Sequence, residues 1–256
     1  EQTVATKRKS PTKLTNNLRD PKRLPIILMM VVAAVCILYT TTLSASSKVV
    51  VARPGGVPEL RSVDAYTEAV DELLGGSILN RNKITINTAD LQQKLLTRFP
   101  ELDSVNVVLP LMGHRVIVEA VSAKPAIRLV SNNEVFLIST KGKVMMPTKD
   151  LQSKIVDVPT VTDEAALELV LGKAALSTQD VTFITTLTKQ LASQKITVNS
   201  LVLPPLASEL HAKVNGAPYY IKFSLLTNPR IAAGQYIALS KNLAKDKVVP
   251  KEYIDS

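Results

Sequence analysis

Cysteine and tryptophan are almost missing from this sequence. Its 256 residues include one cysteine, Cys36, and no tryptophan. A single cysteine cannot form a disulfide within the chain, and it cannot build a cysteine cluster around a metal. The two histidines, His114 and His211, have no acidic residue or cysteine at the spacing of metal ligands. The residues therefore predict neither a metal site nor a cofactor.

Catalytic motifs are missing as well. The sequence contains no serine nucleophile elbow, no phosphate-binding glycine loop and no HExxH motif. Asp103 and Glu119 could approach each other across a hairpin, but exposed acids on a sheet are far more often solvated surface. We therefore expect a binding or scaffolding protein and no catalytic residue. The alternative is an enzyme of unfamiliar design, which a deep pocket with converging polar groups would favour.

Charge is absent from residues 24–47, and residues 26–39 are almost unbroken apolar sequence. A bilayer core needs about 20 apolar residues in a helix, so residues 25–43 are predicted to span a membrane. Thr40, Thr41 and Thr42 can bond back to carbonyls one turn earlier, so their hydroxyls cost little there. The alternative is a cleaved signal peptide, but the apolar run exceeds the usual 7–15 residues. A buried core helix would show a polar stripe, which is absent here.

Positive charge is concentrated before this segment. Residues 1–24 hold seven basic and two acidic residues, and the remainder holds 24 basic and 20 acidic residues. The positive-inside rule therefore places the tail, residues 1–24, in the cytoplasm and the long C-terminal part outside the cell membrane. We expect the tail to be disordered and to act as a topology signal, or to contact anionic lipid or a cytoplasmic partner. The mildly basic body argues against nucleic-acid binding.

The part that follows the apolar segment divides into two patterns. Up to residue 124, we predict a strand over residues 48–53, helices over 63–74 and 88–99 with caps at Ser62 and Asn87, and a hairpin of strands 105–109 and 115–121. This order predicts a small α+β unit in which two helices cover one face of a short sheet.

From Pro125 onward strands predominate. We predict strands over residues 126–130, 134–138, 196–203, 209–214, 219–225 and 248–254, with the Asn215-Gly216 pair as the strongest hairpin signal. Helices are predicted over residues 163–171 and 178–193 and after Pro229, the last with Ala232, Tyr236, Leu239 and Leu243 on its inner face. The fold class is therefore α+β, with a mixed β domain that carries two or three helices.

This layout resembles the bacterial cell division family FtsQ/DivIB. Residues 86–107 are similar to the helix, proline and paired-strand core of a POTRA domain, and Lys124-Pro125-Ala126 matches the family's junction into its β domain. Residues 156–161 resemble the segment that follows, and residues 219–223 and 251–255 resemble the closing strands. The resemblance implies a tail at 1–24, a transmembrane helix at 25–43, a POTRA-like domain at 44–124 and an FtsQ-like β domain at 125–256.

The resemblance also implies a function. Such proteins are non-catalytic, single-pass membrane scaffolds at the division septum, and they help to control septal cell-wall synthesis. They bind FtsB/DivIC-like and FtsL-like division proteins through the β domain, with septal cell-wall synthases as further partners. By position, the partner-binding candidates are Tyr253, Ile254 and Asp255, with Tyr220 and Lys222 beside them. The POTRA-like unit would be a second docking surface.

The predicted last strand gives this implication a physical basis. We expect residues 248–254 to lie at a sheet edge, where backbone donors and acceptors can accept a strand from a partner. The alternative is a strand that is already covered on both sides. A different function also stays open, that of an anchored POTRA-containing accessory protein of secretion or outer-membrane assembly.

Overall fold

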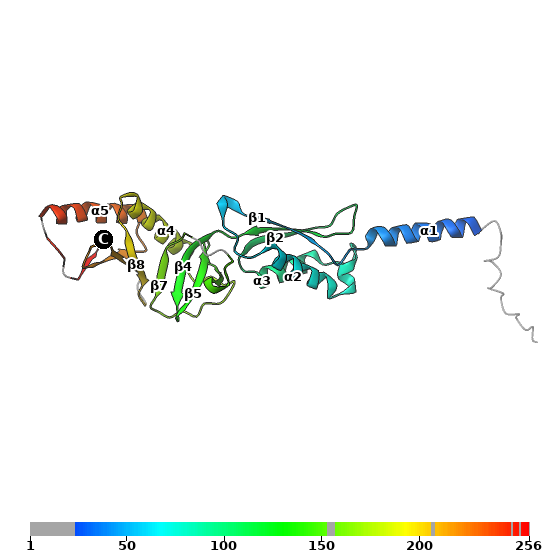
Figure 1. Cartoon of the computed structure of the whole chain (residues 1–256), viewed down its shortest axis with the longest axis horizontal. Coiled ribbons are helices and arrows are strands. Elements are labelled where there is room, and N and C mark those ends of the chain that lie inside the picture. Colours follow the sequence, from blue (N-terminus) through cyan, green and yellow to red (C-terminus); the bar gives the residue numbers. More distant parts are fainter. Residues whose placement is uncertain (1–23, 153–156, 206–207, 247, 251, 256) are drawn as a thin grey trace, which may run out of the picture.

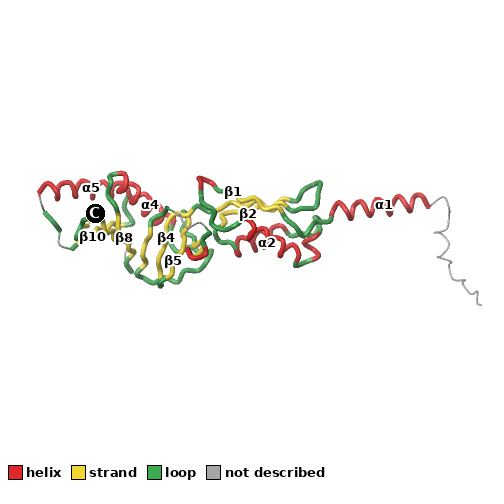
Figure 2. Tube along the Cα trace, viewed as in Figure 1, coloured by secondary structure: helices red, strands yellow, loops and turns green. Residues whose placement is uncertain are grey.

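The computed structural model describes residues 24–152, 157–205, 208–246, 248–250 and 252–255. Residues 1–23 of the predicted cytoplasmic tail, Val156 of the segment 156–161 and Lys251 of the predicted last strand lie outside these residues. Figure 1 shows three bodies in a row: the helix α1, a first α+β unit and a second unit with a larger sheet. Figure 2 shows that the long helices lie along one side of each unit and the strands along the other.

The apolar segment forms α1 (Leu24–Thr41), a helix that along most of its length packs against none of the other elements that the structure describes. With 18 residues, the helix is long and apolar enough to cross a membrane. The predicted back-bonding of the threonines is confirmed, because Thr40 Oγ1 and Thr41 Oγ1 donate to the Ile37 carbonyl at 3.0 and 2.9 Å. The helix ends two residues before the predicted boundary at residue 43, where the chain turns into the first unit.

The first unit has the predicted order of elements. They are β1 (Lys48–Ala52), η1 (Pro54–Gly56), α2 (Val63–Gly75), η2 (Ile78–Arg81), α3 (Thr88–Arg98), β2 (Leu102–Val108) and β3 (Ile117–Ser122). The caps are confirmed: Ser62 Oγ accepts from Ala65 N, and Asn87 Oδ1 accepts from Asp90 N. The strand order is β1-β3-β2, with β1 parallel and β2 antiparallel to β3. Leu74, Leu91 and Leu95 from the helices pack in one core with strand residues such as Val118.

The two acids of the predicted hairpin do not meet. Glu119 lies opposite Asn106, whose amide donates to it at 3.2 Å. Asp103 falls in a register shift between Leu102 and Ser104, and its carboxylate pairs with Lys141 of the second unit. The extra residue of the bulge turns Asp103 away from the β2–β3 ladder, a feature that strict alternation along a strand cannot predict.

The second unit is an eight-stranded mixed sheet with two long helices. Its elements are β4 (Pro125–Ser131), β5 (Glu134–Ser139), β6 (Val144–Pro147), η3 (Thr148–Asp150), β7 (Thr160–Asp163), α4 (Thr178–Ser193), β8 (Val198–Leu203), β9 (Glu209–Val214), β10 (Tyr220–Ser224), α5 (Pro229–Asp246) and β11 (Tyr253–Asp255). The strand order is β11-β10-β9-β8-β7-β4-β5-β6. Phe183, Ile184 and Leu187 of α4 and Tyr236 of α5 pack with the inward side chains of the sheet.

The prediction of a helix over residues 163–171 is wrong. The chain forms β7 instead, which was not predicted, and then a turn built on Asp163. The Asp163 side chain is 7% exposed and accepts from Ala165 N at 3.0 Å, Leu167 N at 2.7 Å and Ser131 Oγ at 3.2 Å. An aspartate that binds backbone amides two and four residues onward offers the chain an alternative to a helix.

The C-terminal predictions are correct in order and inexact in extent. Ala232 and Tyr236 of α5 are buried as predicted, whereas Leu239 is 36% exposed and Ala233 occupies the inner face with them. The predicted strand over residues 248–254 is shortened to β11. Pro250 has no backbone N–H to give to a ladder, and Val248 and Val249 before it are exposed and lie outside the strand.

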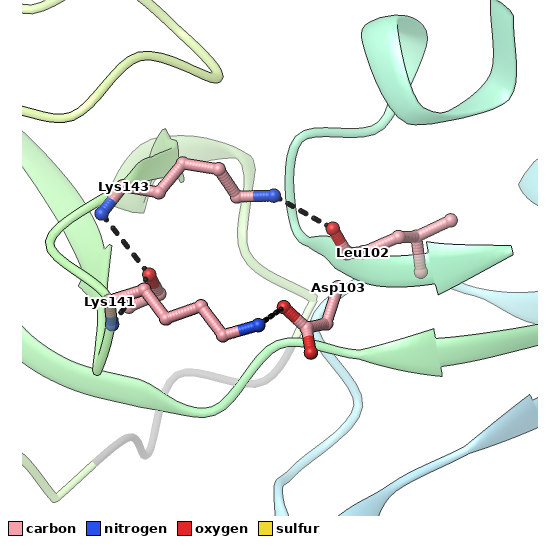
Figure 3. A network of polar contacts seen from close by, with 5 residues as sticks. Leu102, Asp103, Lys141 and Lys143 are labelled. Carbon is pink, nitrogen blue, oxygen red and sulfur yellow. Dashed lines mark hydrogen bonds and ion pairs between the residues drawn. The ribbon is translucent and has the colours of Figure 1, made fainter. Parts of the chain in front are cut away.

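The two units meet at the β5–β6 turn. Lys141 Nζ lies 2.6 Å from Asp103 Oδ1, and Lys143 Nζ donates to the Leu102 carbonyl at 2.8 Å (Figure 3). Burial at this junction lowers the pKa of Lys143. Beside it, Val57 and Leu60 from the first part of the chain pack with residues of β5 and β6, namely Leu137, Met145 and Met146. The junction therefore combines charge-assisted bonds with a small apolar cluster.

A buried carboxylate lies on the first-unit side of this junction. Glu101 is fully buried, and its Oε1 accepts from Arg61 Nε at 2.7 Å and from the Tyr66 hydroxyl at 3.3 Å. Burial, and then the charge and hydrogen bond of Glu101, raise the pKa of Tyr66. A folded-state pKa above the unfolded value of about 10 favours the neutral phenol in the folded state. This contribution to stability is complete below pH 10 and is lost as pH rises toward the folded-state pKa.

We therefore expect the free energy of unfolding of the full chain in detergent micelles to fall above pH about 10 more steeply than that of Tyr66→Phe. At neutral pH the variant should be less stable by about 1 kcal/mol, because it lacks the hydroxyl that bonds Glu101. Denaturant titrations followed by circular dichroism at a series of pH values measure how the free energy of unfolding of each protein changes with pH. Parallel slopes for the two proteins would contradict the assignment to Tyr66.

Candidate partner-binding edge

The last strand, β11, lies at one end of the large sheet and pairs with β10 alone. The pairing is parallel, with Tyr253 beside Tyr220 and Asp255 beside Lys222, and Tyr220 N donates to the Glu252 carbonyl at 3.2 Å. Backbone groups alternate in direction along a strand, so Tyr253 and Asp255 direct theirs away from β10. In the part of the chain that the structure describes, no strand covers that side. The predicted sheet edge is confirmed.

The opposite edge of the same sheet, β6, is covered at its first residue. Val144 N donates to the Lys173 carbonyl at 2.8 Å, and Gly172 N donates to the Val144 carbonyl at 2.9 Å. The segment before α4 thereby satisfies the outward backbone groups of Val144, the first residue of β6. A partly covered edge is less able to template a further strand than an open one. Of the two ends of this sheet, β11 is therefore the one suited to strand addition.

The outward face beside this edge carries an aromatic and cationic row. Lys222 Nζ lies 4.0 Å from the centre of the Tyr253 ring, and the Tyr220 and Tyr253 rings are 5.8 Å apart. Tyr253 is 44% exposed, so its ring offers free apolar area together with a hydroxyl. An ammonium over an aromatic ring holds both groups in place. Four of the five predicted residues, Tyr220, Lys222, Tyr253 and Asp255, thus share one face.

Ile254, the fifth predicted residue, points to the other face. Its side chain is 7% exposed and belongs to the core cluster under α4 and α5, together with Ile221 and Phe223. Alternation along a strand requires this, because its neighbours Tyr253 and Asp255 point outward. Ile254 therefore holds β11 on the sheet, and a direct side-chain contact with a partner is not available to it.

Two further residues of this face were not predicted. His211 Nε2 lies 3.1 Å from Glu209 Oε2, and the His211 ring is 5.1 Å from the Tyr220 ring. Both belong to β9, which pairs with β10 so that His211 is opposite Lys222. The sequence does contain a signal for the placement of Glu209 and His211 on this face. The Asn215-Gly216 hairpin and the alternation of side chains along β9 together fix which side chains share a face.

An open groove of about 600 Å³ continues from this row to α5. It is lined by Glu209, Lys222, Ser224, Gln235, Leu239 and Asp255. The lining mixes both signs of charge with one apolar side chain, as expected where a polypeptide would lie. Among the residues that the structure describes, no group of three or more His, Cys, Asp or Glu is placed to hold a metal ion. The arrangement is suited to binding a strand by its backbone, with side chains of the partner in the groove.

No protein-family model matches the chain, and no curated protein matches it.

Proposed function

We propose that this chain is a non-catalytic, single-pass scaffold of the bacterial division machinery, which binds its partners by strand addition at β11. One observation carries the proposal: the open edge of β11 lies next to Tyr253, Lys222 and Tyr220 on a chain with an apolar helix at the other end. An open edge supplies backbone affinity and the neighbouring side chains supply specificity.

The arrangement of the rest of the chain supports this proposal. The order of β1, α2, α3, β2 and β3 is compatible with the proposed POTRA-like domain, and the large sheet with α4 and α5 is compatible with the proposed FtsQ-like β domain. The basic residues before α1 favour a cytoplasmic N-terminus, with both units outside the cell membrane. The proposed partners are FtsB/DivIC-like and FtsL-like proteins, with septal cell-wall synthases as further candidates.

Imaging of a fluorescent fusion tests the function at the level of the cell. We expect the fusion to be enriched at midcell in dividing cells, and the full chain to co-purify with an FtsB/DivIC-like protein. Uniform membrane fluorescence, together with co-purification of secretion or outer-membrane assembly components, would contradict a division role and favour the anchored accessory protein.

A further inference from the structure

Five large apolar side chains are exposed at the end of the first unit from which α1 emerges. They are Ile78 (88% exposed), Leu79 (62%), Ile84 (77%), Leu111 (92%) and Met112 (89%). They come from two segments, residues 78–84 between α2 and α3 and residues 110–114 between β2 and β3, here named the membrane-proximal loops. Figure 1 shows both segments beside the end of α1. Exposed apolar side chains that gather in one place, unlike single ones, indicate an interaction surface.

Hydrogen bonds hold both loops at the level where α1 ends. Leu43 N donates to the Arg81 carbonyl at 2.7 Å, and Lys83 N donates to the Thr41 carbonyl at 2.8 Å. On the other side, Ser44 N donates to the His114 carbonyl at 2.6 Å. The chain that leaves α1 therefore runs between the two loops and bonds to each of them.

Further contacts join the loops to each other and to the helix. Lys83 Nζ donates to the Leu111 carbonyl at 3.3 Å, which links the first loop to the second. The His114 ring packs edge-to-face on Tyr39 of α1 at 4.7 Å, and its Nδ1 lies 2.9 Å from the Thr42 carbonyl. The position of the loops beside α1 is thus fixed by the fold.

The charge of this end fits an anionic or zwitterionic lipid surface. Arg81, Lys83 and Arg115 lie in or next to the loops, and residues 77–86 and 109–116 contain no acidic residue. Apolar side chains flanked by basic ones are the pattern of segments that lie in the interface of a bilayer. Basic side chains at this level can reach lipid phosphates while the apolar ones enter the acyl boundary.

We propose that the membrane-proximal loops dock into the outer surface of the bilayer that α1 spans. Ile78, Leu79, Ile84, Leu111 and Met112 enter the boundary between headgroups and acyl chains. The inference rests on the proposed membrane anchorage of α1 and does not depend on a division role. Because the loops flank α1 on both sides, docking restricts how the first unit can tilt on the helix. It therefore sets the direction in which the second unit, and the edge β11, project from the membrane.

Depth-dependent quenching in lipid nanodiscs tests this docking. In a Cys36→Ala background, the full-length chain receives one polarity-sensitive fluorophore at Leu79→Cys or Met112→Cys. The nanodiscs contain phosphatidylcholine and phosphatidylglycerol, doped with a lipid that carries a nitroxide near its headgroup or near its chain end. We expect each loop label to lose about half of its emission to the shallow nitroxide, because interfacial side chains enter only about 5–10 Å.

Two controls distinguish the possible outcomes. Leu226→Cys, 76% exposed in the second unit, should show little quenching by either lipid. The native Cys36, exposed on α1, should be quenched by the deep nitroxide and so reports insertion of the anchor. Loop labels that are quenched no more than the label at position 226, with Cys36 quenched, would overturn loop docking and leave the anchor intact. An unquenched Cys36 would overturn both the anchorage and the docking.

Discussion

Proline in place of Tyr253 is expected to abolish capture of an FtsB/DivIC-like partner and to leave the fold intact. The Tyr253 N–H is directed away from β10, so its loss removes no bond of the parallel ladder. A partner strand would use that N–H, and the proline ring would occupy the place of its nearest carbonyl. We expect the affinity to fall by at least about 30-fold, which corresponds to about 2 kcal/mol.

Two control variants separate the backbone effect from other effects of the substitution. Val249→Pro places proline in the exposed segment before β11 and should bind as the unmodified chain does. Tyr253→Ala removes the ring and keeps the N–H, so it should retain part of the affinity. Capture of the purified partner by the full chain in detergent measures the affinity of each variant. The melting temperature of each variant measures whether its fold is intact. Undiminished capture by Tyr253→Pro would rule out strand addition at this edge.

Short-range signals in the sequence predicted most of the elements. Ser177 marks the start of α4 because its hydroxyl and the Asp180 carboxylate cap each other's backbone, and this interaction depends only on neighbours. The Asn215-Gly216 turn was found for the same reason, since the positive φ at Gly216 suits that residue type. The sheet edge at β11 was predicted in part because the pattern of a strand is also local.

Features that depend on distant residues could not be predicted. The helix predicted over residues 163–171 fails because Asp163 is drawn into the sheet by β7, which pairs with β4 and β8 from other parts of the chain. The face that Ile254 occupies follows from its pairing with Ile221 across a parallel ladder, whose register no turn specifies. The covered edge at β6 depends on bonds to residues 172 and 173, which no pattern in β6 itself indicates.

Alanine in place of Gly142 is expected to cost about 4 kcal/mol of unfolding free energy. The residue has φ of +78°, and an added Cβ would lie 1.9 Å from the Leu176 carbonyl oxygen and 2.8 Å from its carbon. A side chain at positive φ costs about 1–2 kcal/mol, and a forced overlap in a packed site adds about 1–3 kcal/mol. The overlap cannot be relieved by a rotamer change, because the obstructing atoms are backbone.

Gly216→Ala is the matched control for this substitution. Gly216 has nearly the same φ, +79°, but its added Cβ would meet no atom of the described residues within 4 Å. Gly216→Ala should therefore lose only the cost of a side chain at positive φ, about 1 kcal/mol of unfolding free energy. Denaturant titration of both variants in detergent isolates the steric part as their difference, and equal losses would contradict the close approach of residue 176. The larger loss at Gly142 should also loosen the junction of the two units, because Lys141 and Lys143 on either side of it hold Asp103 and Leu102.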